Sequence, residues 1–339
     1  MKVLVTGATG FLGGAICERL LNEGVKVRAS GRNLAKGKRL SHLGAEFISS
    51  DLCATEPTRL LCEGVDYVIH SGALSSLWGP RQIFWETNVV GTRSLLEGAL
   101  SAGVKRFVHV SSPSVYFNFV NAVQLDEDSE LPQRFANDYT ASKYAAEEEV
   151  QLAVQRGLSA IILRPRALFG PGDTAIFPRI LLSLKSGRLK VIGTSDNRSD
   201  LTYIDNAVEA CLLALRASEI SSGRVFNITD GASIELWPLL CHIADRLGYK
   251  PPRSSTPLWL ARFAARSLER YHRAFKPDQE PLFTEYSVGI LGCSISLDIT
   301  RAREELNYVP LVSTEEGIER FLSWWVEQEA QGPSVGDEG

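Results

Sequence analysis

Near its start the chain reads Val3-Leu4-Val5-Thr6-Gly7-Ala8-Thr9-Gly10-Phe11-Leu12-Gly13, an apolar run that passes into a glycine-rich turn. The β-branched run predicts a strand, and the apolar spacing around Ala15-Ile16 and Leu20 predicts a helix after the turn. Glycines at this spacing let the backbone approach a dinucleotide pyrophosphate, which binds at the helix N-terminus. Glycines alone are a weak signal, but the strand before them and the helix after them are the context that this motif requires.

The strand-and-helix unit repeats over the first two-thirds of the chain. Short β-branched runs occur at 2–6, 25–30, 46–49, 67–71, 107–111 and 160–163, with helical patterns between them. This alternation predicts an α/β fold with right-handed crossovers and a doubly wound parallel sheet. We therefore expect a dinucleotide-binding Rossmann domain over residues 1–165, with elements returning to it at about 202–230.

The pattern changes after Arg164. A breaker, Gly170-Pro171-Gly172, is followed by helical stretches near 177–186 and 205–217, a strand near 225–228, and then mostly helices and loops. We expect residues 166–201 and 231–328 to form a smaller, mainly helical C-terminal substrate cap. The polar residues 329–339 are expected to form a disordered tail.

Composition excludes several classes of function. With 36 basic and 40 acidic residues the net charge is −4, which gives no basic field for nucleic acid and favours a small-molecule partner. No apolar run reaches the ~18 residues of a membrane span, and the chain begins with a strand instead of a signal peptide. The six cysteines have no C-x-x-C pair and the five histidines no metal-ligand spacing. We expect a cytoplasmic protein with reduced cysteines and no metal.

The end of the second predicted strand indicates the cofactor. An acidic residue there accepts the ribose 2′-hydroxyl of NAD, whereas an arginine suits the 2′-phosphate of NADP. Residues 28–33 contain no carboxylate, and Arg32 can grip a phosphate with two hydrogen bonds, so NADP(H) is favoured over NAD(H). The alternative is that these are solvated charges and NAD binds through other contacts. Asp51, after the third strand, either holds the adenine edge or caps a turn.

Tyr139 and Lys143 stand four residues apart, so they share one face of a helix. A nearby cation favours the phenolate, so we expect the pKa of Tyr139 to fall below ~10 and its hydroxyl to act as a general acid and base. Ser112 follows the fifth strand, where it can donate a hydrogen bond to a substrate carbonyl oxygen. A surface pair and a capping serine are the alternatives.

Six motifs belong together in this chain. They are Thr6-Gly7-x-x-Gly10-x-x-Gly13, Asp51-Leu52, Asn88-Val89-Val90-Gly91-Thr92, Ser112-x-x-Val115-Tyr116, Tyr139-x-x-x-Lys143 and Arg164-Pro165-Arg166. From Met1 to about Trp325 the chain thus resembles the extended short-chain dehydrogenase/reductases of the NAD-dependent epimerase/dehydratase superfamily.

The resemblance implies a role for each matching residue. Tyr139 is the general acid and base, Lys143 lowers its pKa and binds the nicotinamide ribose, and Ser112 holds the substrate oxygen. Asn88 is a structural or relay residue near the site. The cofactor is expected to contact Gly7, Gly10, Phe11, Leu12, Gly13, Arg32, Asp51, Leu52, Ala73, Tyr139, Lys143 and Pro165. A homodimer through a four-helix face is also implied.

Two branches of this family compete, the sugar-nucleotide epimerases and dehydratases and the 3β-hydroxysteroid dehydrogenase-like enzymes. The loop at 74–85 carries Trp78, Phe84 and Trp85, and Phe117 follows Tyr116 where the sugar enzymes usually have glycine. These residues favour an apolar ligand, unless the three aromatic residues of the loop are core for the following helix.

Four stretches resemble the hydroxysteroid branch in more detail: Trp78-Gly79, 164–173, 202–207 and 298–308. They are most similar to bacterial 2-alkyl-3-oxoalkanoate reductases, which implies NADPH-dependent reduction of a β-keto acid to a β-hydroxy acid. Sterol or hydroxysteroid substrates stay open. A non-catalytic dinucleotide-binding sensor is disfavoured, because such a protein would be expected to have lost Tyr139 or Lys143.

Residues 257–275 predict an amphipathic helix. One side carries Leu260, Ala261, Ala264, Leu268 and Tyr271, and the other carries arginines 262, 266, 270 and 273. Most such helices pack on their domain, but this one can also cover an apolar pocket or touch a membrane surface. If it lines the entrance, Arg266 is a candidate contact for a substrate carboxylate.

Overall fold

The computed structural model describes residues 1–218 and 222–331. Within that part of the chain, seven parallel strands form one sheet in the order β12-β7-β5-β4-β1-β2-β3. Their bounds are β1 Lys2–Thr6, β2 Lys26–Gly31, β3 Glu46–Ser49, β4 Tyr67–His70, β5 Arg106–Val110, β7 Ala160–Pro165 and β12 Val225–Ile228. The doubly wound parallel sheet predicted from the sequence is confirmed, with strand ends within two residues of the expected ones.

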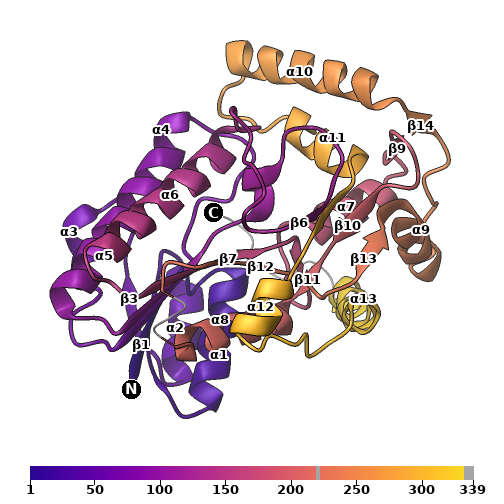
Figure 1. Ribbon diagram of the computed structural model, residues 1–339. Helices are drawn as coiled ribbons and strands as arrows, with labels where there is room; N and C mark the ends of the chain where they lie inside the picture. Colours follow the sequence, from indigo (N-terminus) through magenta and orange to yellow (C-terminus); the bar gives the residue numbers. More distant parts are fainter. Residues whose placement is uncertain (219–221, 332–339) are drawn as a thin grey trace.

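Helices cover both faces of this sheet (Figure 1). On one face α1 (Phe11–Asn22) packs against α8 (Ile204–Arg216), and on the other α3 (Thr55–Leu60), α5 (Gly91–Ala102) and α6 (Asp138–Gln155) lie side by side. Because strand side chains alternate, Val3 and Val5 enter the core cluster with α1 and α8, whereas Leu4 enters the cluster with α5 and α6. Along the edge beyond, α2 (Leu34–His42) packs on β2 and β3.

One long helical stretch changes its winding near the site. It begins as α4 (Arg81–Phe84), continues as the π-helical segment η1 (Trp85–Val90) and ends as α5. The wider turn of η1 contains the buried Asn88, and such π-helical insertions in α-helices often mark functional sites.

The cap contains strands that the sequence did not predict. Its helices are α7 (Phe177–Lys185), α9 (Leu236–Arg246), α10 (Leu258–Phe275), α11 (Glu285–Gly292), α12 (Thr300–Glu305) and α13 (Thr314–Gln331). Beside them lies a four-stranded sheet, ordered β13 (Ser233–Glu235), β10 (Arg198–Asp200), β15 (Ile295–Leu297) and β6 (Ala122–Leu125). Two further pairs join β11 (Thr202–Tyr203) to β8 (Leu168–Phe169) and β14 (Ser255–Thr256) to β9 (Val191–Ile192). Strands this short show no alternation that a sequence pattern can reveal.

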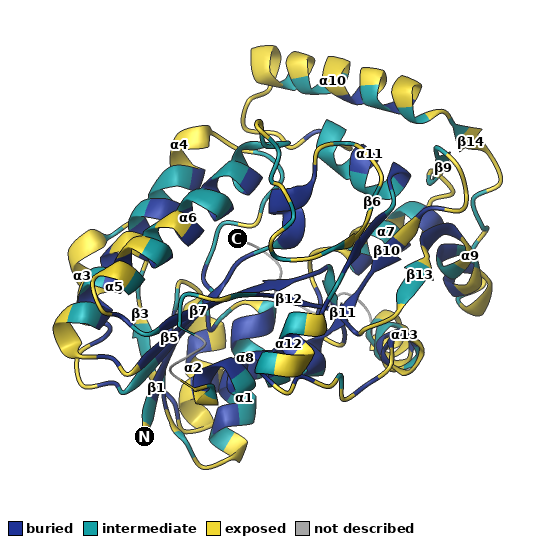
Figure 2. Ribbon diagram, viewed as in Figure 1, coloured by how far each residue is buried: buried dark blue, intermediate teal, exposed yellow. Residues whose placement is uncertain are grey.

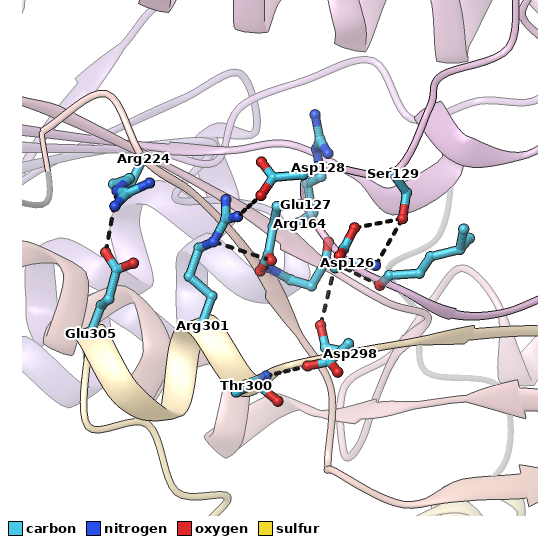
Figure 3. Close-up of polar contacts among 12 residues, drawn as sticks. Asp126, Glu127, Asp128, Ser129, Arg164, Arg224, Asp298, Thr300, Arg301 and Glu305 are labelled. Carbon is cyan, nitrogen blue, oxygen red and sulfur yellow. Dashed lines mark hydrogen bonds and ion pairs between the residues drawn. The ribbon is translucent and has the colours of Figure 1, made fainter.

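Strand β6 connects the two parts of the chain. It comes from the first 165 residues but pairs in parallel with β15 of the cap. Glu127 and Asp128, which follow β6, form ion pairs with Arg301 of α12, as Figure 3 shows. Glu127 in turn accepts a hydrogen bond from the backbone N–H of Asn227 in β12, over 2.7 Å. The loop that leads to α6 is therefore fixed between the cap and the sheet.

The tail begins later than we expected. Helix α13 extends to Gln331, so residues 329–331 are helical and not disordered. The reason is that Glu329 forms an ion pair with Lys185 at 2.6 Å and accepts a hydrogen bond from the hydroxyl of Tyr249. Residues 332–339 of the expected tail lie outside the described residues.

Helix α10 lies at the surface of the cap, packed on α11 (Figures 1 and 2). Only Ala261 and Ala265 are fully buried, whereas Trp259, Phe263 and Phe275 are each about two-thirds or more exposed. Of the apolar side predicted from the sequence, Ala261 is buried, whereas Leu260, Ala264 and Tyr271 are exposed. Among the described residues, no helix is long and apolar enough to cross a membrane.

Candidate active site

The glycine turn leaves no room for side chains. Gly7 has φ of +68°, and a Cβ on it would lie 2.7 Å from the Cα of Gly72. A Cβ on Gly13 would lie 2.2 Å from the carbonyl oxygen of Gly7, which also accepts a hydrogen bond from Gly10 N over 2.8 Å. Gly10 is exposed, so the turn offers bare backbone to a ligand.

Helix α1 supplies donors at the same place. Its first intrahelical hydrogen bond runs from Gly14 N to Gly10 O, 3.0 Å long, so the N–H groups of Phe11, Leu12 and Gly13 precede the helical ladder. The side chain of Leu12 is buried in the core, which leaves its backbone as the part that can meet a phosphate. A dinucleotide pyrophosphate fits this cradle, because a Cβ would fill it and the helix end favours negative charge.

The ends of β2 and β3 lie side by side, because Gly31 pairs with Ser49. Beyond β2, Arg32 is exposed and forms no ion pair or hydrogen bond with the rest of the described chain, whereas Arg39 pairs with Glu18 at 3.0 Å. Beyond β3, the Asp51 carboxylate accepts a hydrogen bond from Cys53 N over 3.0 Å, so Asp51 does cap a turn. The Leu52 side chain lies against Gly72.

Tyr139, Ser112 and Lys143 come together where α6 crosses the end of β5. The side chains of Tyr139 and Ser112 share a hydrogen bond, and Ser112 Oγ also accepts from Ser114 N over 3.2 Å. Lys143 is buried and donates from Nζ to the carbonyl oxygen of Val110 over 2.8 Å.

The pKa of Tyr139 does not follow our expectation. Burial raises it to about 12, with the nearby Tyr286 adding to the rise and the hydrogen bond from Ser112 opposing it. Burial also lowers the pKa of Lys143 to about 8, against the attraction of Glu147. The expected fall of the Tyr139 pKa below ~10 is therefore not found: burial raises this pKa, and the Lys143 ammonium donates to Val110 O and is not among the groups that shift it.

Asn88 joins three segments of the site. Its Oδ1 accepts from Leu74 N over 2.7 Å, and its Nδ2 donates to Leu74 O over 3.1 Å and to Ser142 Oγ over 2.9 Å. Ser142 donates onward to the carbonyl oxygen of Tyr139 over 2.7 Å. Asn88 therefore positions the loop that contains Ala73 relative to the first turn of α6.

Beneath this group lie two buried histidines on neighbouring strands. His70 shares hydrogen bonds with Thr6 over 2.6 Å and with Thr92 over 2.9 Å, which connects the end of β1 to the start of α5. Burial, and next the Lys143 charge, lower the pKa of His70 to about 3, and the pKa of His109 also falls well below its usual value. Both rings are therefore neutral near pH 7.

Comparison with known proteins identifies the family to which this sequence belongs. The family model described as "NAD dependent epimerase/dehydratase family" matches residues 3–229. The chain belongs to this family.

Three curated relatives extend over nearly the whole chain. The Escherichia coli (strain K12) protein YbjS is 40% identical, over 96% of this chain and 97% of its own. A 2-alkyl-3-oxoalkanoate reductase from Shewanella oneidensis is 32% identical, over 94% and 84%. The sterol-4-alpha-carboxylate 3-dehydrogenase erg26, decarboxylating, from Schizosaccharomyces pombe is 33% identical, over 95% and 97%.

A solved structure, "Crystal structure of gox2253", has a TM-score of 0.78 and 26% identity, covering 96% of this chain and 98% of that one. Membership of the epimerase/dehydratase family, with relatives named as reductases and dehydrogenases, makes the chain an oxidoreductase that uses a nicotinamide dinucleotide.

The three aromatic residues of the 74–85 loop, Trp78, Phe84 and Trp85, have different neighbours in the fold. Phe84 is buried core, as the alternative interpretation predicted. Trp85 lies under the guanidinium of Arg81, 5.3 Å from the ring centroid, beside α6. Trp78 reaches the end of α10 and donates to the carbonyl oxygen of Pro277 over 2.9 Å. Trp78 therefore packs toward the cap, and the three aromatic side chains do not lie together on one surface.

Two residues of the site were missed by sequence reasoning as functional groups. Tyr286 of α11 is buried deeply enough that the pKa of its phenol is raised, and it stacks edge-on against Phe117, with ring centroids 5.5 Å apart. Arg166 follows Pro165 at the buried end of β7 and is itself buried. No motif marks Tyr286, but the strand-end reasoning that selected Ser112 also applies to Arg166.

Proposed function

We propose that this chain is an NADP(H)-dependent oxidoreductase that interconverts an apolar 3-oxo acid and its 3-hydroxy acid. The observation that carries the proposal is the hydrogen-bonded pair of Tyr139 and Ser112 beside the buried Lys143, at the same edge of the sheet as the glycine turn. The relatives supply the substrate class. The reductase is named for a 2-alkyl-3-oxoalkanoate and the dehydrogenase for a sterol-4-alpha-carboxylate, and both are apolar compounds with a carboxylate close to the reacting carbon.

Each side chain then has one task. When bound, the reduced nicotinamide supplies the hydride for the carbonyl carbon. Tyr139 gives its phenolic proton to the carbonyl oxygen, and Ser112 donates a hydrogen bond that stabilises the negative charge developing there. Lys143 would hold the nicotinamide ribose, as the family resemblance implies. The raised pKa of Tyr139 favours the protonated form that reduction requires.

Arg32 supports the choice of NADP(H). It is exposed at the end of β2 without a partner in the described chain, and a guanidinium binds a phosphate with two parallel hydrogen bonds. We expect Arg32→Ser to raise the KM for NADPH at least about tenfold, the usual effect of losing a charged hydrogen bond. The KM for NADH should change little. Arg39→Ser is the matched control, because Arg39 already pairs with Glu18. Equal effects on both cofactors would contradict the preference.

The test of the function is cofactor consumption by the purified protein with three ketones: a long-chain 2-alkyl-3-oxo acid, a 3-ketosteroid and a UDP-4-ketosugar. We expect turnover of the oxo acid, lost in Tyr139→Phe. Because 3-oxo acids decarboxylate, the reverse reaction with a stable 3-hydroxy acid and NADP⁺ is the firmer assay. Turnover of the steroid alone would move the substrate class to sterols, and turnover of the sugar alone would overturn the proposal.

A further inference from the structure

Arg166 stands at the edge of the sheet where ligands of this fold bind. It follows β7 directly, and its backbone N–H donates to Ile228 O over 3.0 Å and to Thr202 Oγ1 over 3.1 Å. The backbone is therefore held from two sides, and only 5% of the residue is exposed. A side chain on such a rigid base is well suited to fixing a ligand.

The guanidinium of Arg166 is buried with too few partners. Its Nη2 lies 3.5 Å from Ser199 Oγ, which is a long hydrogen bond, and in the described chain Nε has no hydrogen-bond partner. Among the residues described, it forms no ion pair. Burial accordingly lowers the pKa of Arg166, although Tyr286 and Asp200 oppose the shift. A buried positive charge normally has a partner, because an unpaired one costs several kcal/mol.

Asp200 is the acid that acts on Arg166, but it is engaged elsewhere. Its Oδ2 accepts a hydrogen bond from Leu297 N over 2.6 Å, and it does not come within ion-pair distance of the guanidinium. Its pKa is raised by burial, with Arg166 acting only as a weaker opposing influence. Asp200 therefore stabilises the arginine from a distance and leaves the buried Nε without an acceptor.

Tyr286 connects Arg166 with the reacting centre. Its ring packs edge-on against Phe117, 5.5 Å between centroids, and its phenol acts electrostatically on both Tyr139 and Arg166. The ends of β5 and β7, from which Ser112 and Arg166 follow, are joined by the hydrogen bond from Ser111 N to Leu163 O, 2.7 Å long. The arginines of α10 are less suitable, because Arg262 and Arg266 both bind the carboxylate of Glu285 at 2.7 Å. The hypothesis that Arg266 meets the substrate is thus weakened by the ion pair it already makes.

We propose that Arg166 is the carboxylate-binding residue of the substrate site, with Nε and its neighbouring guanidinium nitrogen donating to the two carboxylate oxygens. The assignment rests on the proposed function and names the group that orients the substrate. In a 3-oxo acid one carbon separates the carbonyl carbon from the carboxylate. A carboxylate held by Arg166 therefore fixes the carbonyl oxygen toward Ser112 and Tyr139, and the apolar chains extend into the rest of the cap.

The first test uses the unmodified protein and three alcohols with NADP⁺: a 2-alkyl-3-hydroxy acid, its methyl ester and the secondary alcohol without the carboxyl group. We expect kcat/KM for the acid to exceed that for the ester at least about tenfold, the range for a hydrogen bond to a charged group. Turnover of acid and ester alike would overturn the carboxylate site alone. Turnover of none of the three would overturn the proposed function, and this assignment with it.

The second test changes the arginine. Arg166→Gln should lower kcat/KM for the acid about 10- to 100-fold, mainly through KM, and alter that for the ester less than about twofold. Arg166→Lys should recover part of the preference. Arg266→Gln is the matched control and should leave both substrates unchanged. Equal losses on acid and ester in Arg166→Gln would show a structural role only. If that variant does not fold, the ratio of acid to ester in the unmodified protein still decides.

Discussion

The side-chain amide of Asn88 binds both backbone groups of Leu74: Oδ1 accepts from Leu74 N over 2.7 Å, and Nδ2 donates to Leu74 O over 3.1 Å. The amide thus satisfies the backbone N–H and C=O of Leu74, as the backbone of a neighbouring strand would do in a sheet. Because Nδ2 also donates to Ser142, Asn88→Asp removes two hydrogen bonds and adds a buried charge. We expect this variant to lose about 1–3 kcal/mol of unfolding free energy in urea and to have a lower kcat.

The control for this change is Asn137→Asp. Asn137 caps α6 by accepting from Thr140 N through Oδ1, over 2.8 Å, which an aspartate also does. Its added charge at a helix N-terminus is favourable, so the unfolding midpoint should stay the same or rise. If both variants lost equal stability, the amide of Asn88 would have no special role.

Gly13 and Gly14 are neighbours with opposite tolerance for a side chain. A Cβ on Gly13 would meet Gly7 O at 2.2 Å, whereas a Cβ on Gly14 would meet Ala8 O at an ordinary 3.4 Å. We expect Gly13→Ala to weaken NADPH binding about tenfold or more, because the turn must shift to relieve the clash. Gly14→Ala should bind normally and gain about 0.5–1 kcal/mol as a helix residue. Fluorescence titration with NADPH measures the first effect, and equal affinities would contradict it.

Reduction should lose rate at alkaline pH. It requires a proton on Tyr139, and the pKa of about 12 keeps that proton in place over this range. It also requires a positive charge on Lys143, which loses its charge as the pH rises through its pKa of about 8. We therefore expect kcat/KM for reduction to be constant below about pH 7 and to fall as the pH rises through about 8. In Lys143→Arg the side chain stays charged, so any remaining activity should not fall there. A rate of the unmodified protein that rises through pH 8 would sink this assignment.

Acid should destabilise the protein through its buried histidines. The folded-state pKa of His70 is about 3 and that of His109 is also strongly lowered, below the usual 6.5. Between the lowered folded-state pKa and the usual 6.5, the unfolded chain binds more protons than the folded chain. The free energy of unfolding therefore keeps this contribution above about pH 6.5 and loses it as the pH falls.

His109 offers a variant that tests this, because neither ring nitrogen has a hydrogen-bond partner in the described part of the chain. We expect His109→Leu to lose less of its thermal midpoint between pH 7 and pH 5 than the unmodified protein. His242, which is exposed on α9, is the control, and His242→Leu should behave like the unmodified protein. An unchanged acid sensitivity in His109→Leu would leave the effect to other groups.

The sheet and the cofactor turn were predictable because their signals are local. Strands such as β1 and β7 are short runs rich in Val, Ile and Leu, and the glycine spacing stands between a strand and a helix. Tyr139 and Lys143 were also visible, because helical periodicity alone places them together. The direction of the pKa shift of Tyr139 could not be predicted. It depends on how deeply the fold buries both groups and on the hydrogen bond from Lys143 to Val110.

The parts that sequence reasoning missed depend on distant contacts. Tyr286 reaches the site only because the fold packs α11 against Phe117, and nothing near Tyr286 in the sequence shows this. Arg166 lies inside a recognised motif, but the sequence does not show that its guanidinium has few hydrogen-bond partners. That becomes visible only in the fold, where Ser199 and Asp200 are its polar neighbours. Two- and three-residue strands such as β8 and β10 form through their neighbours and not through their own composition.

Strand β6 limits how this enzyme can be divided. Residues 122–125 pair with β15, more than 160 positions later in the chain, so no single cut separates the cap from the rest. A chimera that takes its cap from a relative would have to exchange this short strand as well, together with the loop that Arg301 holds. Substrate range in such a scaffold is therefore expected to change by single substitutions within the cap more readily than by the exchange of whole modules.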